Sequence, residues 1–159
     1  MTITHTQPPA AGNPQVQQLL DRRLAEVAHL QDAVIATRDG ILQYASGTVD
    51  VVAQPGRDPR DLHREAGERR SAMLASLASL AERVTADGGV GRHVRSLVEA
   101  RDGWCVIGPI GRHSLVLLYA LKSAEPGMLG HHLARLDQDL GALLDTERRG
   151  TAQLPGPTA

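Results

Sequence analysis

The sequence predicts a three-layer α+β domain in which helices pack against the faces of one five-stranded antiparallel sheet. Three observations lead to this fold class. Two apolar runs are folded back at Asp-Gly, apolar residues recur with helical spacing in three segments, and residues 113–121 form a nearly continuous apolar run. The helices and strands predicted from these observations follow one another in the order α-β-β-α-β-β-β-α. Short strands joined by tight turns pair antiparallel, and an amphipathic helix must bury its apolar stripe against another element.

The tripeptide Arg-Asp-Gly occurs twice, in "AVIATRDGILQYAS" (residues 33–46) and in "LVEARDGWCVIG" (residues 97–108). Asp-Gly between apolar runs is typical of a type I′ hairpin turn, in which both central residues have positive φ. We therefore interpret Asp39, Gly40, Asp102 and Gly103 as turn residues. The alternative, a pair of carboxylates for acid-base catalysis, has no second catalytic group near either copy.

The first helix is predicted to begin at Asn13, as the N-cap, with Pro14 in the first helical position, and to end near His29. A second helix should begin at Asp58-Pro59 and end near Asp87, before Gly88-Gly89. Its expected buried stripe consists of Leu62, Ala66, Met73, Leu77, Leu80 and Val84. Its expected second flank consists of the small residues Ser71, Ala75, Ala78 and Ser79.

The last helix is predicted up to about Glu147, because leucines recur there at spacings of three and four: Leu129, Leu133, Leu136, Leu140 and Leu143. Among the strands, residues 31–37 and 113–121 should form the central pair, since a continuous apolar run indicates a strand buried on both faces. Strands 41–47 and 90–100 keep polar residues and should lie nearer the edges.

Length and composition indicate one domain. The 159 residues are 42% hydrophobic, enough for one core. We expect the domain at residues 13–147, with disordered tails at 1–12 and 148–159, where no periodicity is found. The net charge is −1, without a basic face, so nucleic acid and anionic membranes are unlikely partners. The chain contains no signal-peptide pattern and no long apolar stretch for direct membrane insertion, and we expect a cytoplasmic protein.

Residues that could bind a cofactor or a metal do not form a site in the sequence. The single lysine, Lys122, is not in a Gly-rich loop, so the chain has no P-loop for nucleotide phosphates. His131 and His132 are adjacent on a predicted helix and point about 100° apart, which favours a solvated surface over a metal site. Cys105 is expected to be a buried, inert thiol. The "GPIGRH" segment, residues 108–113, leads into a strand and is interpreted as a tight connection. We predict no cofactor and no metal.

The stretch "DRRLAEVAHLQDAVIATRDGILQYASG" resembles the start of roadblock domains, the dynein-light-chain family that is widespread in bacteria. The later "GWCVIGPIGRHSLVLLYAL" resembles that family's strand, Gly-rich turn and apolar central strand. The resemblance covers about residues 14–146. One segment departs from it, since residues 48–64 are longer and more charged than the family's linker. The resemblance implies a roadblock-like fold and a non-enzymatic homodimer that acts as a scaffold or regulator of a Ras-like small GTPase in a bacterial signalling complex. It also implies a sensor-kinase-like protein as a further partner.

The resemblance also implies where contacts lie. In the family, the strand equivalent to 90–100 pairs with its two-fold mate, so Val94, Ser96 and Val98 would flank the dimer contact. The second helix would pack beside its mate through Ser71, Ala75, Ala78 and Ser79. Candidates for contact with the GTPase, which we expect to be exposed, are Arg57 and Arg60 in the long loop and Arg112 in the Gly-rich turn.

Three alternatives stay open. The edge strand could instead be the blunted edge of a monomer, protected by Arg92 and Arg95. A small-molecule sensor of the PAS or GAF type also places helices around an antiparallel sheet, and it predicts a cavity inside the domain, whereas a platform predicts a filled core. An enzyme that uses Cys105 or the histidines lacks any placed catalytic constellation.

Overall fold

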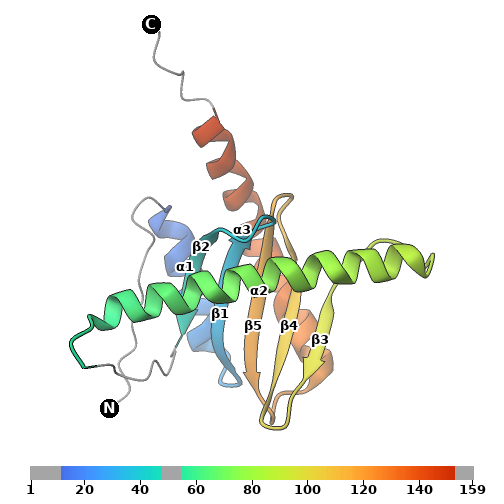
Figure 1. The fold of residues 1–159 in the computed structure, drawn as a ribbon, viewed down its shortest axis with the longest axis horizontal. Coiled ribbons are helices and arrows are strands. Elements are labelled where there is room, and N and C mark those ends of the chain that lie inside the picture. The colour runs from blue at the N-terminus through green and yellow to red at the C-terminus, as the bar shows by residue number, and fades with distance from the viewer. Residues whose placement is uncertain (1–11, 48–54, 153–159) are drawn as a thin grey trace, which may run out of the picture.

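The computed structural model describes residues 12–47 and 55–152. Figure 1 shows a central sheet with a long helix across its near face and further helices behind it. The elements are α1 (Pro14–Glu26), β1 (Leu30–Thr37), β2 (Leu42–Gly47), α2 (Pro59–Asp87), β3 (Ser96–Glu99), β4 (Gly103–Ile110), β5 (Ser114–Leu121) and α3 (Pro126–Ala152). The predicted fold class and element order are therefore confirmed.

The sheet is antiparallel throughout, with the strand order β2-β1-β5-β4-β3. The apolar strand β5 lies at its centre and pairs with β1, as predicted from the run at residues 113–121. Strands β2 and β3 are the two edges, in agreement with their polar content.

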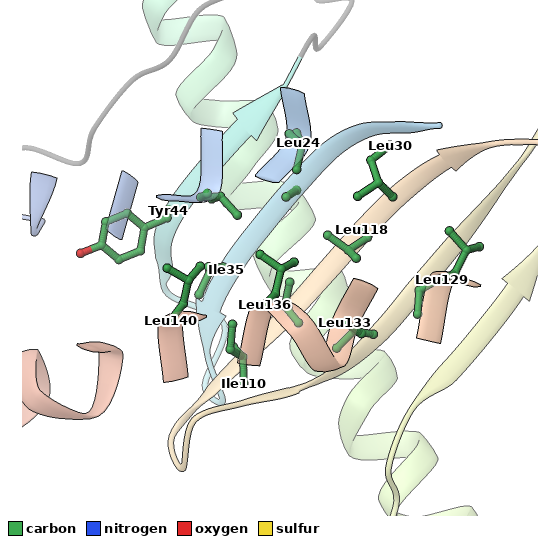
Figure 2. Close-up of a cluster of buried hydrophobic side chains, with 14 of the residues drawn as sticks. Leu24, Leu30, Ile35, Tyr44, Ile110, Leu118, Leu129, Leu133, Leu136 and Leu140 are labelled. Atoms are coloured by element: carbon green, nitrogen blue, oxygen red, sulfur yellow. The ribbon is translucent and has the colours of Figure 1, made fainter. Parts of the chain in front are cut away.

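Two apolar clusters lie on opposite faces of the sheet. The larger one joins β1, β4 and β5 to α1 and α3, and Figure 2 shows Ile35 and Leu118 of the sheet beside Leu136 and Leu140 of α3. The smaller one joins the other face to α2 through residues such as Val34, Leu74 and Leu117. Among the described residues, the buried members of both clusters are aliphatic except Tyr44, which lies at one side of the larger cluster.

Both predicted helix starts are capped by the expected residue. The side chain of Asn13 accepts a hydrogen bond from the Gln15 backbone N–H, and the side chain of Asp58 accepts one from the Arg60 backbone N–H. Each cap is followed by Pro in the first turn, where a missing N–H costs nothing.

Two helix ends differ from the prediction. Helix α1 ends at Glu26 and not near His29, because Val27 is already extended and the His29 carbonyl accepts a hydrogen bond from Leu121 of β5. Helix α3 continues to Ala152, so residues 148–152 are helical and not part of a tail. The remainder of the two expected tails, residues 1–11 and 153–159, and residues 48–54 of the long linker lie outside the described residues.

The predicted strand 90–100 is shorter in the structure, where β3 spans only Ser96–Glu99. Gly89 and Gly91 have φ values of +62° and +97°, which are incompatible with an extended strand. Val94 therefore precedes the strand and does not belong to it.

Both Asp-Gly pairs lie at hairpin connections, but neither forms the predicted type I′ turn. In the β1–β2 connection only Gly40 has positive φ (+88°), and its N–H donates to the Thr37 carbonyl at 3.0 Å. The Thr37 N–H donates to the Ile41 carbonyl at 2.9 Å, which closes a three-residue loop with a glycine bulge. In the β3–β4 connection Gly103 lies outside the positive-φ region, and a Cβ there would come within 2.6 Å of the Ala120 carbonyl oxygen. Glycine is needed at residue 103 for close strand approach and not for φ.

Helix α2 packs on the sheet through its small side chains. Its buried residues are Leu62, Ala66, Gly67, Ser71, Leu74 and Ala78. A Cβ on Gly67 would lie 2.8 Å from a methyl group of Leu42, and a Cβ on Gly40 would lie 3.4 Å from the Ala72 Cα atom. The Ser71 hydroxyl is satisfied by the Gly67 carbonyl at 2.9 Å. Glycine, alanine and serine thus let the helix lie close to the strands.

This packing corrects the predicted faces of the helix. Met73, Leu80 and Val84 were expected to be buried but are exposed by 51%, 54% and 63%. Ser71 and Ala78, expected on a free flank, are buried, and Ala75 is half-buried above the β1–β2 turn, whereas Ser79 is exposed. The physical reason is that α2 lies close to the sheet, which leaves room among the small residues for Leu62 and Leu74 only. Met73, Leu80 and Val84 therefore point away from the sheet.

The first prediction concerns the β1–β2 turn. We expect Gly40→Val to lower the free energy of unfolding by ~1–3 kcal/mol, because a β-branched residue is strained at positive φ and would press on α2. The matched control is Gly127→Val, at a helical position where an added Cβ meets nothing within 4 Å. Urea unfolding of both variants measures the difference. An unchanged unfolding midpoint for the Gly40 variant would contradict the turn geometry.

The second prediction separates the two faces of α2. Leu74 is 1% exposed, so Leu74→Ala should cost ~2–5 kcal/mol through the cavity that it leaves. Leu80→Ala removes the same atoms from the outer face and should cost well under ~1 kcal/mol in a monomer. The comparison is made by urea unfolding at a protein concentration low enough to keep both variants monomeric. Equal losses for the two variants would refute the orientation of α2.

Candidate interaction surface

The outer face of α2 carries an apolar stripe. Met73, Leu77, Leu80 and Val84 follow one another at spacings of four, three and four, which places them on one side of a helix. Leu77 is half-buried and the other three are exposed. Figure 1 shows that the C-terminal part of α2, where Val84 lies, extends past β3 and beyond the sheet. Contiguous exposed apolar surface of this kind marks an interaction site more often than a solvated face. We call these four residues the α2 stripe.

The β3 edge of the sheet is open and largely apolar. Leu97 and Val98 are exposed by 44% and 40%, and Val94, just before the strand, is also exposed. Ser96, the third residue predicted at the contact, is half-buried, and its hydroxyl lies 2.8 Å from the His93 Nε2 atom. An edge strand with free backbone groups is a ready template for pairing with another strand.

The opposite edge, β2, is covered by α1. The Gln17 side chain donates to the Ala45 backbone carbonyl at 2.9 Å, and the Asn13 N–H donates to the Tyr44 hydroxyl at 2.8 Å. The Tyr44 hydroxyl in turn donates to the Glu147 carboxylate of α3 at 2.6 Å. Burial and this carboxylate raise the pKa of Tyr44, which keeps its hydroxyl protonated as a donor. The two edges therefore differ: α1 packs against β2 and bonds one of its backbone carbonyls, whereas no helix of the described residues packs extensively against β3.

A polar group anchors α2 beside the sheet. The Arg70 guanidinium lies 4.9 Å from the centre of the Tyr119 ring, and its Nη1 atom lies 3.6 Å from the Asp32 carboxylate. Tyr119 pairs with Asp32 on one side and with Cys105 on the other, so the three residues form a row across β1, β5 and β4. Burial raises the pKa of the Cys105 thiol, which makes it a weak nucleophile.

The three arginines predicted to contact a partner lie in two places. Arg57 and Arg60 are exposed at the start of α2, where Arg57 forms an ion pair with Glu65. Arg112 is exposed in the β4–β5 turn, and its backbone N–H donates to the Asp145 carboxylate at 2.8 Å. The neighbouring Gly111 N–H donates to the Asp137 carboxylate at 2.7 Å. The "GPIGRH" segment is thus a tight turn that is fixed to α3 by two carboxylates.

Residues 12–47 and 55–152 contain neither a metal-binding cluster nor a helix that could span a membrane. Within residues 12–47 and 55–152, no group of three or more His, Cys, Asp or Glu side chains could hold a metal ion. His131 is exposed, and burial lowers the pKa of the half-buried His132. None of the helices in this part of the chain is both long and apolar enough to cross a membrane.

The α2 stripe and the open β3 edge are therefore the main surfaces that the fold leaves uncovered: the stripe is apolar and exposed, and within the described residues the edge has no neighbouring strand. Sequence reasoning located the β3 edge but assigned the α2 stripe to the core. The missed signal was Leu74, which lies on the same helical side as Gly67, Ser71 and Ala78 at spacings of four, three and four. A stripe of small residues that includes one leucine indicates a close helix–sheet contact.

No family model and no curated protein matches the sequence. The structure, however, is similar to several solved ones. It matches the roadblock/LC7 domain from Streptomyces avermitilis with a TM-score of 0.64 and 20% identity, over 84% of this chain and 98% of that one. It matches Myxococcus xanthus MglB with a TM-score of 0.67 and 8% identity, over 84% and 97% of the two chains. A third match is an MglB with a tetrameric arrangement, with a TM-score of 0.66 and 17% identity over 89% and 98%. These similarities confirm what the hairpin and central-strand motifs predicted: this chain has the roadblock/LC7 fold.

Proposed function

We propose that this chain is a non-enzymatic homodimeric scaffold that regulates a Ras-like small GTPase in a bacterial signalling complex. The observation that carries the proposal is that a chain of roadblock/LC7 fold has both an exposed apolar α2 stripe and an open β3 edge. Both features lie on surfaces that the fold itself does not cover.

Self-association explains both features together. A two-fold dimer uses the same patch on each copy, so one edge strand can pair with its equivalent while two α2 helices approach. Ser96 and Val98 remain in the proposed contact, with Val94 beside it. On α2, the small residues Ser71 and Ala78 are buried against the sheet and cannot contact a second copy. We therefore place the helix–helix contact at the α2 stripe, where exposed Ser79 lies next to Leu80. The tetrameric MglB of similar fold is an oligomer by its own description, which supports association in this chain.

The role toward a GTPase follows from the resemblance to roadblock proteins and from the chemistry that the chain lacks. Its sequence contains no P-loop, and Lys122 lies over the Trp104 ring at 4.3 Å, paired with Glu99. A partner would therefore bind the nucleotide, and a sensor-kinase-like protein would be a further component of the complex. The aliphatic core around Ile35, Leu118 and Leu136 favours a platform over a sensor that encloses a ligand.

The third prediction is that the chain alone does not bind GTP, since it has no P-loop to hold the phosphates. Equilibrium dialysis with GTP and Mg²⁺ should show no stoichiometric binding.

The positive experiment uses the Ras-like GTPases of the source organism. Each is purified and loaded with GDP or with a non-hydrolysable GTP analogue. We expect the dimer to bind at least one of them with an affinity that depends on the nucleotide. A chain that is monomeric by light scattering at micromolar concentration, or tight GTP binding by the chain itself, would contradict the proposal.

The fourth prediction concerns Arg57, Arg60 and Arg112 as contacts with that GTPase. We expect Ala at these positions to weaken binding more than it slows hydrolysis in the bound complex. An arginine finger, by contrast, would cost on the order of 10³-fold or more in hydrolysis rate when removed. Single-turnover hydrolysis at saturating scaffold concentration separates the two effects. Arg135→Ala, at an exposed position on α3, is the matched control. A collapse of hydrolysis with unchanged affinity in one variant would show a finger.

A further inference from the structure

The backbone of β3 presents alternate residues to the open edge. The Ala100 N–H donates to the Gly103 carbonyl at 2.9 Å, so the backbone groups of Ala100 point toward β4. In an antiparallel strand the N–H and C=O of one residue point to the same edge, and successive residues alternate. Ser96 and Val98 therefore also face β4, whereas Leu97 and Glu99 direct their N–H and C=O groups outward. Arg95 immediately precedes β3, and the same alternation, continued by one step, directs its N–H and C=O groups outward.

The side chains of the outward-facing residues lie on the α3 side of the sheet. Glu99 is opposite Trp104 and forms an ion pair with Lys122, which lies over the Trp104 ring. Arg95 approaches Gly130 of α3 so closely that a Cβ there would collide with its guanidinium. In the described part of the chain no carboxylate lies within salt-bridge distance of Arg95. The open edge thus presents three side chains on one face of the sheet: basic Arg95, apolar Leu97 and acidic Glu99.

Taking the proposed homodimer and its antiparallel β3 pairing as given, we infer the register of that pairing: the two-fold axis lies between the two Leu97 residues. Each Leu97 then lies opposite Leu97 of the partner subunit, and each Glu99 lies opposite Arg95 of the partner subunit. All three pairs join outward-facing residues, so each can exchange both backbone hydrogen bonds. The edge is self-complementary in charge because the two-fold axis repeats the Arg–Glu pair at both ends of the contact.

Neighbouring registers lack this match. An axis at Val98 places Leu97 opposite Glu99 and Arg95 opposite Arg101. An axis at Glu99 places two carboxylates opposite each other. Opposite charges on facing residues stabilise an antiparallel pair, and like charges destabilise it. Only the axis at Leu97 combines an apolar centre with two pairs of opposite charge.

Cysteine cross-linking tests the register directly. In a Cys105→Ser background that still forms the dimer, Leu97→Cys should form an intermolecular disulfide on mild oxidation. Facing Cα atoms in such a pair are about 5.5 Å apart, within the range that a disulfide spans. Val98→Cys alone should not cross-link, but a mixture of Ser96→Cys and Val98→Cys chains should. Efficient cross-linking of Val98→Cys alone, without cross-linking of Leu97→Cys, would overturn the inferred register.

Charge exchange provides an independent test. Arg95→Glu and Glu99→Arg should each weaken dimerisation by about tenfold, and the double variant should recover most of the loss. With the axis at Val98, Arg95→Glu would face Arg101 and tighten the dimer, which would also overturn the inference. Sedimentation at two ionic strengths measures these affinities. A monomeric wild type contradicts the proposed function itself, whereas a wild-type dimer with the wrong cross-links contradicts the register alone.

Discussion

The close contact between α2 and the sheet determines most of what this chain can present to a partner. Gly67 fits under a methyl group of Leu42, and Ser71 and Ala78 complete a face without long side chains. Dense packing at such short separation leaves little room for long side chains, and of the leucines of α2 only Leu62 and Leu74 are buried. Met73, Leu80 and Val84 therefore point away from the sheet. An exposed apolar stripe is thus a direct consequence of how the helix is seated.

The second constraint is that the two edges of the sheet have different neighbours: α1 packs against β2, whereas the outer edge of β3 is open. At β2, the Gln17 side chain of α1 donates to a backbone carbonyl of the strand. The Asn13 N–H, the Tyr44 hydroxyl and the Glu147 carboxylate form a connected set that joins α1, β2 and α3. These hydrogen bonds hold α1 and α3 beside β2, where the Ala45 carbonyl is already occupied by the Gln17 amide. At β3, exposed Leu97 and Val98 form a short strand whose outer backbone groups remain available. Association by strand pairing is thereby directed to one side of the domain.

The sequence predicted the elements far better than it predicted the faces. Asn13 and Asp58 marked the helix starts, and the apolar run of β5 identified the central strand, because capping and burial on both faces act locally or along a single strand. The orientation of α2 depended instead on how closely the sheet allows it to approach, which no local pattern contains. The turn types failed for a similar reason: Gly103 is required by the Ala120 carbonyl of a neighbouring strand. The prediction treated Met73, Leu80 and Val84 as core residues because they are apolar, but an apolar side chain can also lie on the surface and contact a partner.

The way the β4–β5 turn is held bears on how the chain could influence a GTPase. Two successive backbone N–H groups, those of Gly111 and Arg112, donate to carboxylates of α3, and Gly111 has a φ of +58° that few other residues tolerate. These contacts restrain the backbone of the turn, so the side chain of Arg112 has more freedom than the segment that carries it. A finger that inserts into a partner's active site needs a segment that can reach it, whereas a surface that holds a partner in place gains affinity from being pre-organised. The braced turn therefore fits a platform that positions a GTPase better than one that supplies a catalytic group to it.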